Sequence, residues 1–118
     1  MNFKKVITFF FVAVIGGCAI TSVESDLVRA NAAYNNKNID KAIEIYSTLS
    51  DNGNVTAMDR LGAIYLSPAT KNYILAEHYL YKAASKGSSN SMINLSMGYK
   101  QMFDKNNPKK AVYWAKKA

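Results

Sequence analysis

Residues that carry chemistry are scarce in this chain of 118 residues. It has one cysteine, one histidine and one tryptophan. A single cysteine excludes an internal disulfide, and a single histidine leaves no imidazole set for a zinc site. His78 lies off the apolar stripe that begins at Ala76, so we expect it to face solvent without the positioned partner that a general base needs. The sequence therefore predicts no enzyme, no metal site and no cofactor.

The N-terminal residues differ in composition from the rest. Lys4 and Lys5 precede an apolar run over residues 6–15, and Gly16 and Gly17 follow it. Basic, apolar and small residues in this order are typical of a secretory signal. The run is also shorter than the roughly twenty apolar residues that span a bilayer. We predict that residues 1–17 form a signal peptide, while an uncleaved anchor and a buried core helix remain alternatives.

The end of this run, Ile15-Gly16-Gly17-Cys18, resembles a bacterial lipobox. The resemblance implies cleavage before Cys18, acyl chains (palmitate among them) on that residue, and a linker over residues 18–25. Ala19 stands where aspartate would signal inner-membrane retention, so the resemblance implies a bacterial cell envelope lipoprotein on the outer membrane, facing the periplasm. The alternative is a thiol that happens to lie beside an ordinary cleavage site.

Positive charge gathers toward the C-terminal end of a chain whose net charge is +7. The lysines of this region, against Asp104 alone, are Lys100, Lys105, Lys109, Lys110, Lys116 and Lys117. Such a face suits an anionic membrane surface or an acidic protein patch. We expect no nucleic acid partner, because export argues against it. A solvated lysine face is the simplest interpretation.

The remainder of the chain repeats itself. Residues 57–65 return as residues 91–99, with apolar positions at helical spacing, and the same period separates Gly53 from Gly87. This period predicts an all-α chain, a short α-solenoid of about three helix-turn-helix hairpins within residues 26–118. The hairpins are expected at about 26–53, 54–87 and 88–118.

Local signals mark the ends of the expected helices. Asn38, Asn72 and Asn107 each precede an expected second helix, and an asparagine side chain can accept from the free N–H groups of a first turn. Gly53 and Gly87 suit the left-handed conformation that ends a helix. These residues therefore predict the helix boundaries.

The spacing within the second unit resembles a Sel1-like repeat. The residues that carry the resemblance are Ala57, Leu61, Gly62, Tyr65, Ala76, Tyr79, Lys82, Ala83, Ala84 and Gly87. The first unit is closer to a tetratricopeptide repeat, a related family with the same architecture. The resemblance implies a scaffold that binds another protein or a peptide, with the first helix of each hairpin lining a concave surface.

By that resemblance, the candidate partner-binding residues are Asp59, Ala63, Ile93, Met97 and Lys100. The predicted function is a membrane-anchored scaffold, either an envelope adaptor or assembly factor or a toxin-neutralising partner. The alternatives are an exported Sel1-like enzyme acting on cell-wall or β-lactam substrates, and a membrane-surface or glycan-binding protein using the basic C-terminal helix. A dimer through that uncapped helix also remains open.

Overall fold

The computed structural model describes residues 22–103 and 108–118, and these residues form helices joined by short turns, with no strand among them. The chain divides into two compact units, Met1–Ile45 and Tyr46–Ala118, which we describe separately. The prediction of an all-α fold is confirmed for the described residues. Cys18 and the expected signal peptide lie outside them.

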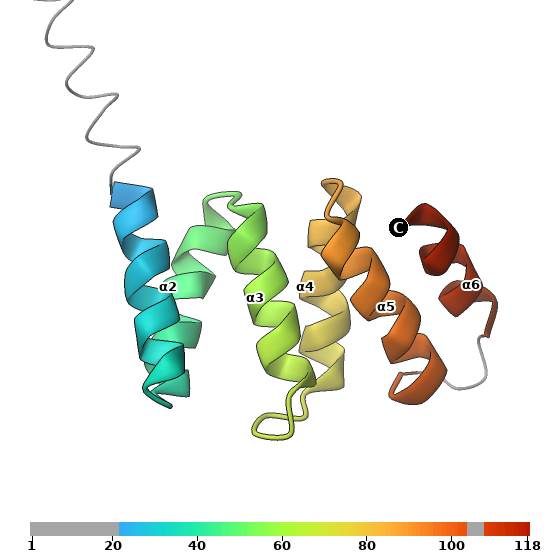
Figure 1. The fold of residues 1–118 in the computed structure, drawn as a ribbon, viewed down its shortest axis with the longest axis horizontal. Helices are drawn as coiled ribbons and strands as arrows, with labels where there is room; N and C mark the ends of the chain where they lie inside the picture. Colours follow the sequence, from blue (N-terminus) through green and yellow to red (C-terminus); the bar gives the residue numbers. More distant parts are fainter. Residues whose placement is uncertain (1–21, 104–107) are drawn as a thin grey trace, which may run out of the picture. The chain divides into compact units, whose positions relative to one another are not determined.

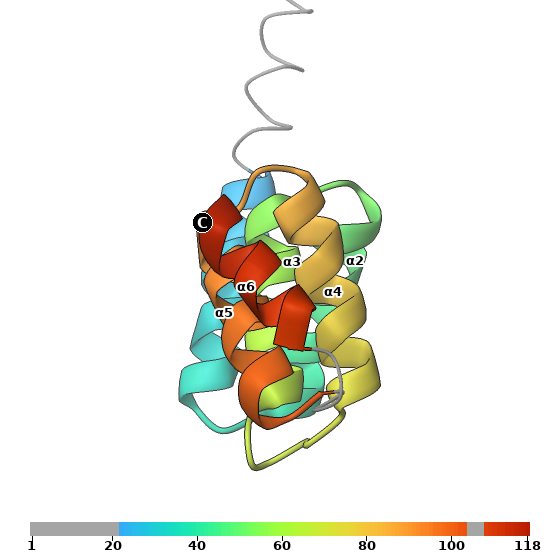
Figure 2. The same cartoon turned by 90° about the vertical axis from the view of Figure 1, so that its right-hand side faces the viewer.

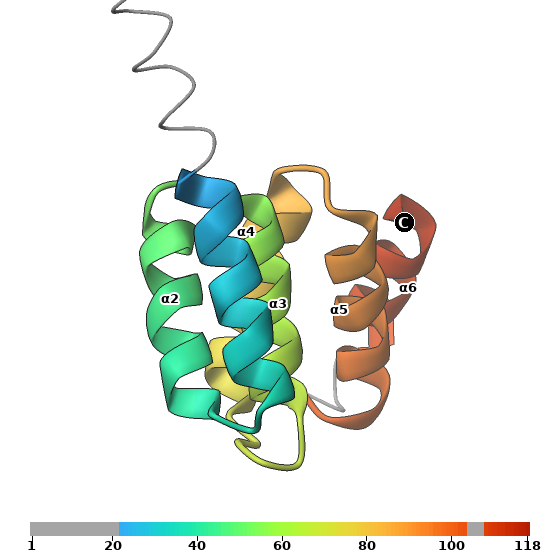
Figure 3. The same ribbon diagram turned by 60° about the vertical axis from the view of Figure 1, so that its left-hand side comes forward.

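The first unit contains a helical hairpin. A helix over residues 22–35 is followed by the start of α2 (Ile39–Asp51), and the two run antiparallel, as Figure 3 shows. In the turn between them Lys37 has a φ of 65°, and the Asn38 side chain accepts from the Lys41 amide at 3.3 Å. Residues 22–25, expected within a linker, already belong to the first helix.

The second unit continues from the end of α2 into four further helices, α3 (Val55–Leu66), α4 (Tyr73–Ser85), α5 (Ser89–Gln101) and α6 (Pro108–Lys117). The helices α3 and α4 pack as one hairpin and α5 and α6 as another, and α4 packs on α5 (Figure 1). Figure 2 shows α6 placed over α5, beside α4. The second unit is thus a short helical solenoid of two stacked hairpins.

Side chains and glycines set the ends of these helices. The residues Asn54, Asn72 and Ser88 cap α3, α4 and α5 by accepting from the amide three positions later. Gly53 and Gly87 have φ values of 88° and 95°. The predictions for Asn72 and for both glycines are confirmed, and Asn107 lies outside the described residues.

The loop between α3 and α4 lacks glycine. Ile64 instead offers its carbonyl oxygen to the Ser67 hydroxyl at 2.7 Å and to the Thr70 hydroxyl at 2.5 Å. Lys71 then has a φ of 46°, at the position equivalent to Lys37 in the preceding hairpin. Hydroxyl groups and one left-handed lysine therefore close a turn for which glycine would be the ordinary choice.

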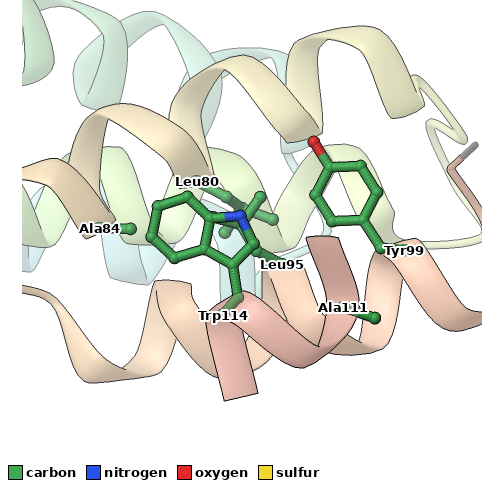
Figure 4. Packing of buried hydrophobic residues seen from close by; sticks show 6 residues of the cluster. All are labelled: Leu80, Ala84, Leu95, Tyr99, Ala111 and Trp114. Carbon is green, nitrogen blue, oxygen red and sulfur yellow. The ribbon is translucent and has the colours of Figure 1, made fainter. Parts of the chain in front are cut away.

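The core of the second unit joins its last three helices. Its buried side chains, shown in Figure 4, are Leu80, Ala84, Leu95, Tyr99, Ala111 and Trp114. Of the residues expected to face inward in this hairpin, Leu61, Ala76, Leu80 and Ala83 are fully buried, whereas Tyr65 is only partly buried. A Cβ atom added at Gly62 would overlap Leu80 Cδ2, so this glycine lets α3 and α4 approach closely.

Candidate protein-binding groove

The helices α3 and α5 hold a hollow of about 350 Å³ between them. Its lining residues are Thr56, Asp59, Arg60, Ala63, Asn90, Ile93 and Asn94. On each helix they recur at helical spacing, and they alternate with buried positions such as Leu61 and Leu95. One helical face therefore packs on the core while the neighbouring face forms what we call the α3–α5 groove.

Equivalent positions of consecutive repeats line the groove. Thr56 and Asn90 are one repeat period apart, and so are Arg60 and Asn94. Sequence reasoning missed these four residues, although helical spacing could have found them, because each lies three positions from a predicted candidate on the same helix.

Asp59 accepts hydrogen bonds from two serine side chains. Its carboxylate accepts from the Ser88 hydroxyl at 2.7 and 2.8 Å and from the Ser91 hydroxyl. Ser88 is also the N-cap of α5, so a negative charge lies where the helix dipole favours it. Asp59 is therefore not an isolated, solvated carboxylate. Asp59 fastens α3 to the first turn of α5 and forms part of the groove wall.

The other predicted site residues are spread along the same two helices. Ala63 and Ile93 line the groove, and the Ile93 side chain is 48 % exposed. Met97 is 49 % exposed and Lys100 is exposed, but both lie farther along α5, outside the groove lining. The structure thus brings Asp59, Ala63 and Ile93 together, and the binding role of all five residues stays a prediction.

The groove offers mixed chemistry. The amides of Asn90 and Asn94 each provide donors and an acceptor, Arg60 provides a positive charge, and Ile93 provides exposed apolar surface. Within residues 22–103 and 108–118, no three His, Cys, Asp or Glu side chains come together in a way that could hold a metal ion. This combination suits an extended polypeptide segment, whose backbone needs hydrogen bonds and whose side chains need apolar contact.

Titratable residues on α4 lie elsewhere. His78 is exposed and lies with Ile74, Glu77, Tyr81 and Lys82 around a second hollow of about 360 Å³. Its ring meets the Tyr79 ring edge-on, with the centroids 5.1 Å apart. The sequence expected an exposed His78, and this is confirmed.

Tyr79 also stacks on Tyr65 of α3, with centroids 5.9 Å apart. Burial of the Tyr65 hydroxyl raises its pKa, and the neighbouring Tyr79 raises it further. A raised pKa favours the neutral Tyr65 hydroxyl.

A family model of the Sel1 repeat matches residues 36–54, 55–88 and 89–118. The chain belongs to the Sel1 repeat family. Two of the matched boundaries fall at the N-caps of α3 and α5, Asn54 and Ser88. No curated protein and no solved structure matched the chain. Sel1 repeats serve as protein-interaction scaffolds and are generally non-catalytic.

The sequence prediction of Sel1-like hairpins is therefore confirmed. None of the helices in the described residues is long and apolar enough to cross a membrane. The repeats imply a protein partner, and the α3–α5 groove is the surface where two of them meet.

Proposed function

We propose that this chain is a membrane-anchored scaffold that holds a segment of another protein in the α3–α5 groove. One observation carries the proposal, namely that equivalent positions of two successive Sel1 repeats converge on a single hollow. Such grooves bind extended chain by pairing side-chain amides with the peptide backbone and by covering apolar side chains. Ile93, half exposed in the free protein, would be covered by the bound segment.

In this proposal Cys18 carries the acyl chains that hold the protein on the outer membrane. The support is the lipobox pattern Ile15-Gly16-Gly17-Cys18 that ends the apolar run. Several acyl chains, at about 0.8 kcal/mol per buried methylene, give stable attachment. The scaffold would then act in the bacterial envelope, as an adaptor or assembly factor or as the neutralising partner of a toxin.

The groove is tested by photo-crosslinking in cells. A photoreactive amino acid replaces Ile93 in one variant and Val112 in a control, because these side chains are 48 % and 50 % exposed. We expect one discrete protein adduct at position 93 and none at position 112. The adduct should weaken when Arg60→Glu and Asn94→Ala are added. Equal adducts at both positions, or none at position 93, would contradict the groove.

The anchor is tested separately by metabolic labelling with palmitate. We expect label on the full chain and its loss, with release from membranes, in the Cys18→Ser variant. An unlabelled parent protein would remove the anchor and leave the groove proposal untouched. Crosslinking at position 93 that persists in the Cys18→Ser variant would show that partner binding does not depend on the lipid.

A further inference from the structure

Helix α6 presents a basic outer surface in the described part of the structure. It carries Lys109, Lys110, Lys116 and Lys117 and no Asp or Glu. In the described residues the ion pairs join Arg29 to Asp26 and Lys41 to Glu44, all within residues 22–45. In the described part of residues 46–118 the carboxylate side chains are Asp51, Asp59 and Glu77, none of them on α6.

Two of those carboxylates already accept hydrogen bonds from hydroxyl groups. Asp59 accepts from Ser88 and Ser91, and Glu77 accepts from the Tyr99 hydroxyl. The α6 lysines therefore keep their charge toward solvent, apart from contacts with aromatic rings. The Lys117 ammonium, for example, lies 5.3 Å from the centroid of the Tyr113 ring.

Large apolar side chains lie between these lysines. Val112 and Tyr113 are each 50 % exposed on α6, and Tyr81 of α4 is 56 % exposed. Tyr81 and Tyr113 both meet the buried Trp114 ring edge-on, with centroids 5.8 and 5.0 Å from it. The surface that we call the α4–α6 face is made of Tyr81, Lys109, Val112, Tyr113, Lys116 and Lys117.

We propose that the α4–α6 face docks on an anionic phospholipid surface. Each lysine near such a surface contributes attraction to anionic headgroups, and tyrosine rings are favoured at the depth of the headgroups. The lysine stems allow the ammonium groups to stay at the headgroups while Val112 and Tyr113 approach the acyl boundary. Trp114 stays in the core and holds α6 in place.

A bilayer fits this face better than an acidic peptide does. The side chains of α6 line neither of the two hollows described above. The lysines instead extend along the whole helix, from position 109 to position 117. A broad, laterally continuous negative surface meets all of them at once, and a short acidic segment meets few.

The test is vesicle sedimentation with the full chain carrying Cys18→Ser. Vesicles contain phosphatidylcholine alone or phosphatidylcholine with phosphatidylglycerol. The neutral vesicles measure the contribution of the apolar N-terminal residues, which every variant shares. One variant combines Lys109→Gln, Lys116→Gln and Lys117→Gln. Its matched control combines Arg29→Gln, Lys37→Gln and Lys41→Gln, which change the net charge equally in the other unit.

We expect the α6 variant to lose on the order of 100-fold in partitioning to phosphatidylglycerol vesicles, about fivefold for each lysine. The control should lose much less of this partitioning. Added salt should weaken the binding of the parent protein to phosphatidylglycerol vesicles. A variant with Val112→Ser and Tyr113→Ser should lose a smaller part of the vesicle binding, and this loss should not depend on the salt concentration. The fluorescence of Trp114, the only tryptophan, checks that α6 remains docked in each variant.

Three outcomes would overturn the proposal. The parent protein could show no preference for phosphatidylglycerol. The control could lose as much as the α6 variant, which would assign binding to net charge. An oligoglutamate peptide could bind the parent more tightly than the vesicles do and lose binding in the α6 variant, which would replace the membrane by an acidic protein. None of these results changes the expected crosslinks at position 93, so the groove is judged independently.

Discussion

The two hairpins of the second unit close in different ways. In α3–α4, Gly62 faces the partner helix, and a Cβ there would overlap Leu80 Cδ2. In α5–α6, Gly98 faces the following loop, and a Cβ there would overlap the Phe103 ring at Cε2. Leu80 is fully buried on a helix, whereas Phe103 is partly buried after the end of α5.

The difference shows how one repeat pattern accommodates two kinds of packing. Ser96, one repeat period after Gly62, occupies the position where the first of these hairpins needs its glycine. The second hairpin has its glycine at position 98 instead and fills the space with the Phe103 ring. That ring lies edge-on to Tyr99 and Tyr73, at centroid distances of 5.1 and 6.4 Å. In α5–α6, edge-on contacts of the Phe103 ring therefore fill the space beside the glycine. In α3–α4, that space is closed by the neighbouring helix.

Trp114→Ala should break the second hairpin and affect the first much less. The indole packs in the core formed with Leu80 and Leu95, and removing a buried tryptophan costs about 3–5 kcal/mol. We expect amide hydrogen exchange to lose most protection in α5 and α6 and far less in α3. Tyr113→Ala, at a half-exposed neighbour, is the control and should cost far less. Equal loss of protection in α3 would show that the hairpins do not differ in how they open.

The paired substitutions Gly62→Ala and Gly98→Ala test the comparison directly. Overpacking a core costs about 1–3 kcal/mol, whereas alanine gains about 1 kcal/mol over glycine in a helix. The Leu80 side chain is fully buried and cannot turn toward solvent. We therefore expect Gly62→Ala to lower the free energy of unfolding by about 1–2 kcal/mol. Phe103 can swing toward solvent, so Gly98→Ala should be close to neutral. Denaturant unfolding measures both, and the reverse order would mean that the Phe103 ring is held as firmly as Leu80.

Asp59→Asn should loosen the connection between the hairpins. The substitution removes the charge from hydrogen bonds donated by Ser88 and Ser91, and bonds to a charged group contribute about 1.5–3 kcal/mol. Because asparagine keeps one acceptor oxygen, we expect the free energy of unfolding to fall by about 1–2 kcal/mol. Asp51→Asn, at an exposed position of α2, is the control. Equal effects of the two substitutions would remove the structural role of Asp59.

Ser50→Ala should stabilise the protein by about 1 kcal/mol, because a buried hydroxyl without a partner is unfavourable. Ser50 is 2 % exposed, and its hydroxyl finds no hydrogen-bond partner in the described part of the structure. The equivalent position of the next repeat is already Ala84. Ser85→Ala, in the exposed last turn of α4, is the control: it gains the same helix propensity but loses the hydrogen bond that the Ser85 hydroxyl donates to the Tyr81 carbonyl at 2.8 Å. Thermal unfolding of both variants compares them, and an equal gain would leave Ser50 without a special effect.

Tyr65→Phe should have the smallest effect, confined to alkaline pH. Burial raises the pKa of Tyr65 above its ordinary value of 10.0. The stability that this shift contributes is complete below pH 10.0 and is lost as the pH rises through the pKa of the folded protein. Unfolding free energies measured on both sides of that pH should therefore decline less steeply in the Phe variant. A steeper decline would contradict the direction of the shift.

The helical hairpins could be predicted because the sequence repeats with a fixed period and has apolar residues at helical spacing. Ala76, Leu80 and Ala83 are spaced for one helix face, and all three are buried as expected. The turn glycines Gly53 and Gly87 could be predicted as well, because their positive φ values depend only on the local sequence of each turn.

The groove could be predicted only in part. Ala63 and Ile93 were candidates because the resemblance to Sel1-like repeats implies that the first helix of each hairpin lines a concave surface. The role of Asp59 does not follow from the sequence, because its partners Ser88 and Ser91 lie 29 and 32 residues away and meet it only when one hairpin stacks on the next. The position of Phe103 over Gly98 does not follow from the repeat period either, because the residues one period earlier are Ala69 and Ile64.

The hydrogen bonds from Ser88 and Ser91 to Asp59 have a consequence for how the protein unfolds. In linear repeat arrays, cooperativity depends on the interfaces between neighbours as well as on the stability of each unit. A carboxylate of one repeat that holds the first turn of the next couples the two folding equilibria. The melting of α5 then withdraws part of the support of α3, and the array responds to denaturant more nearly as one body. Without that coupling, each hairpin would open at its own midpoint.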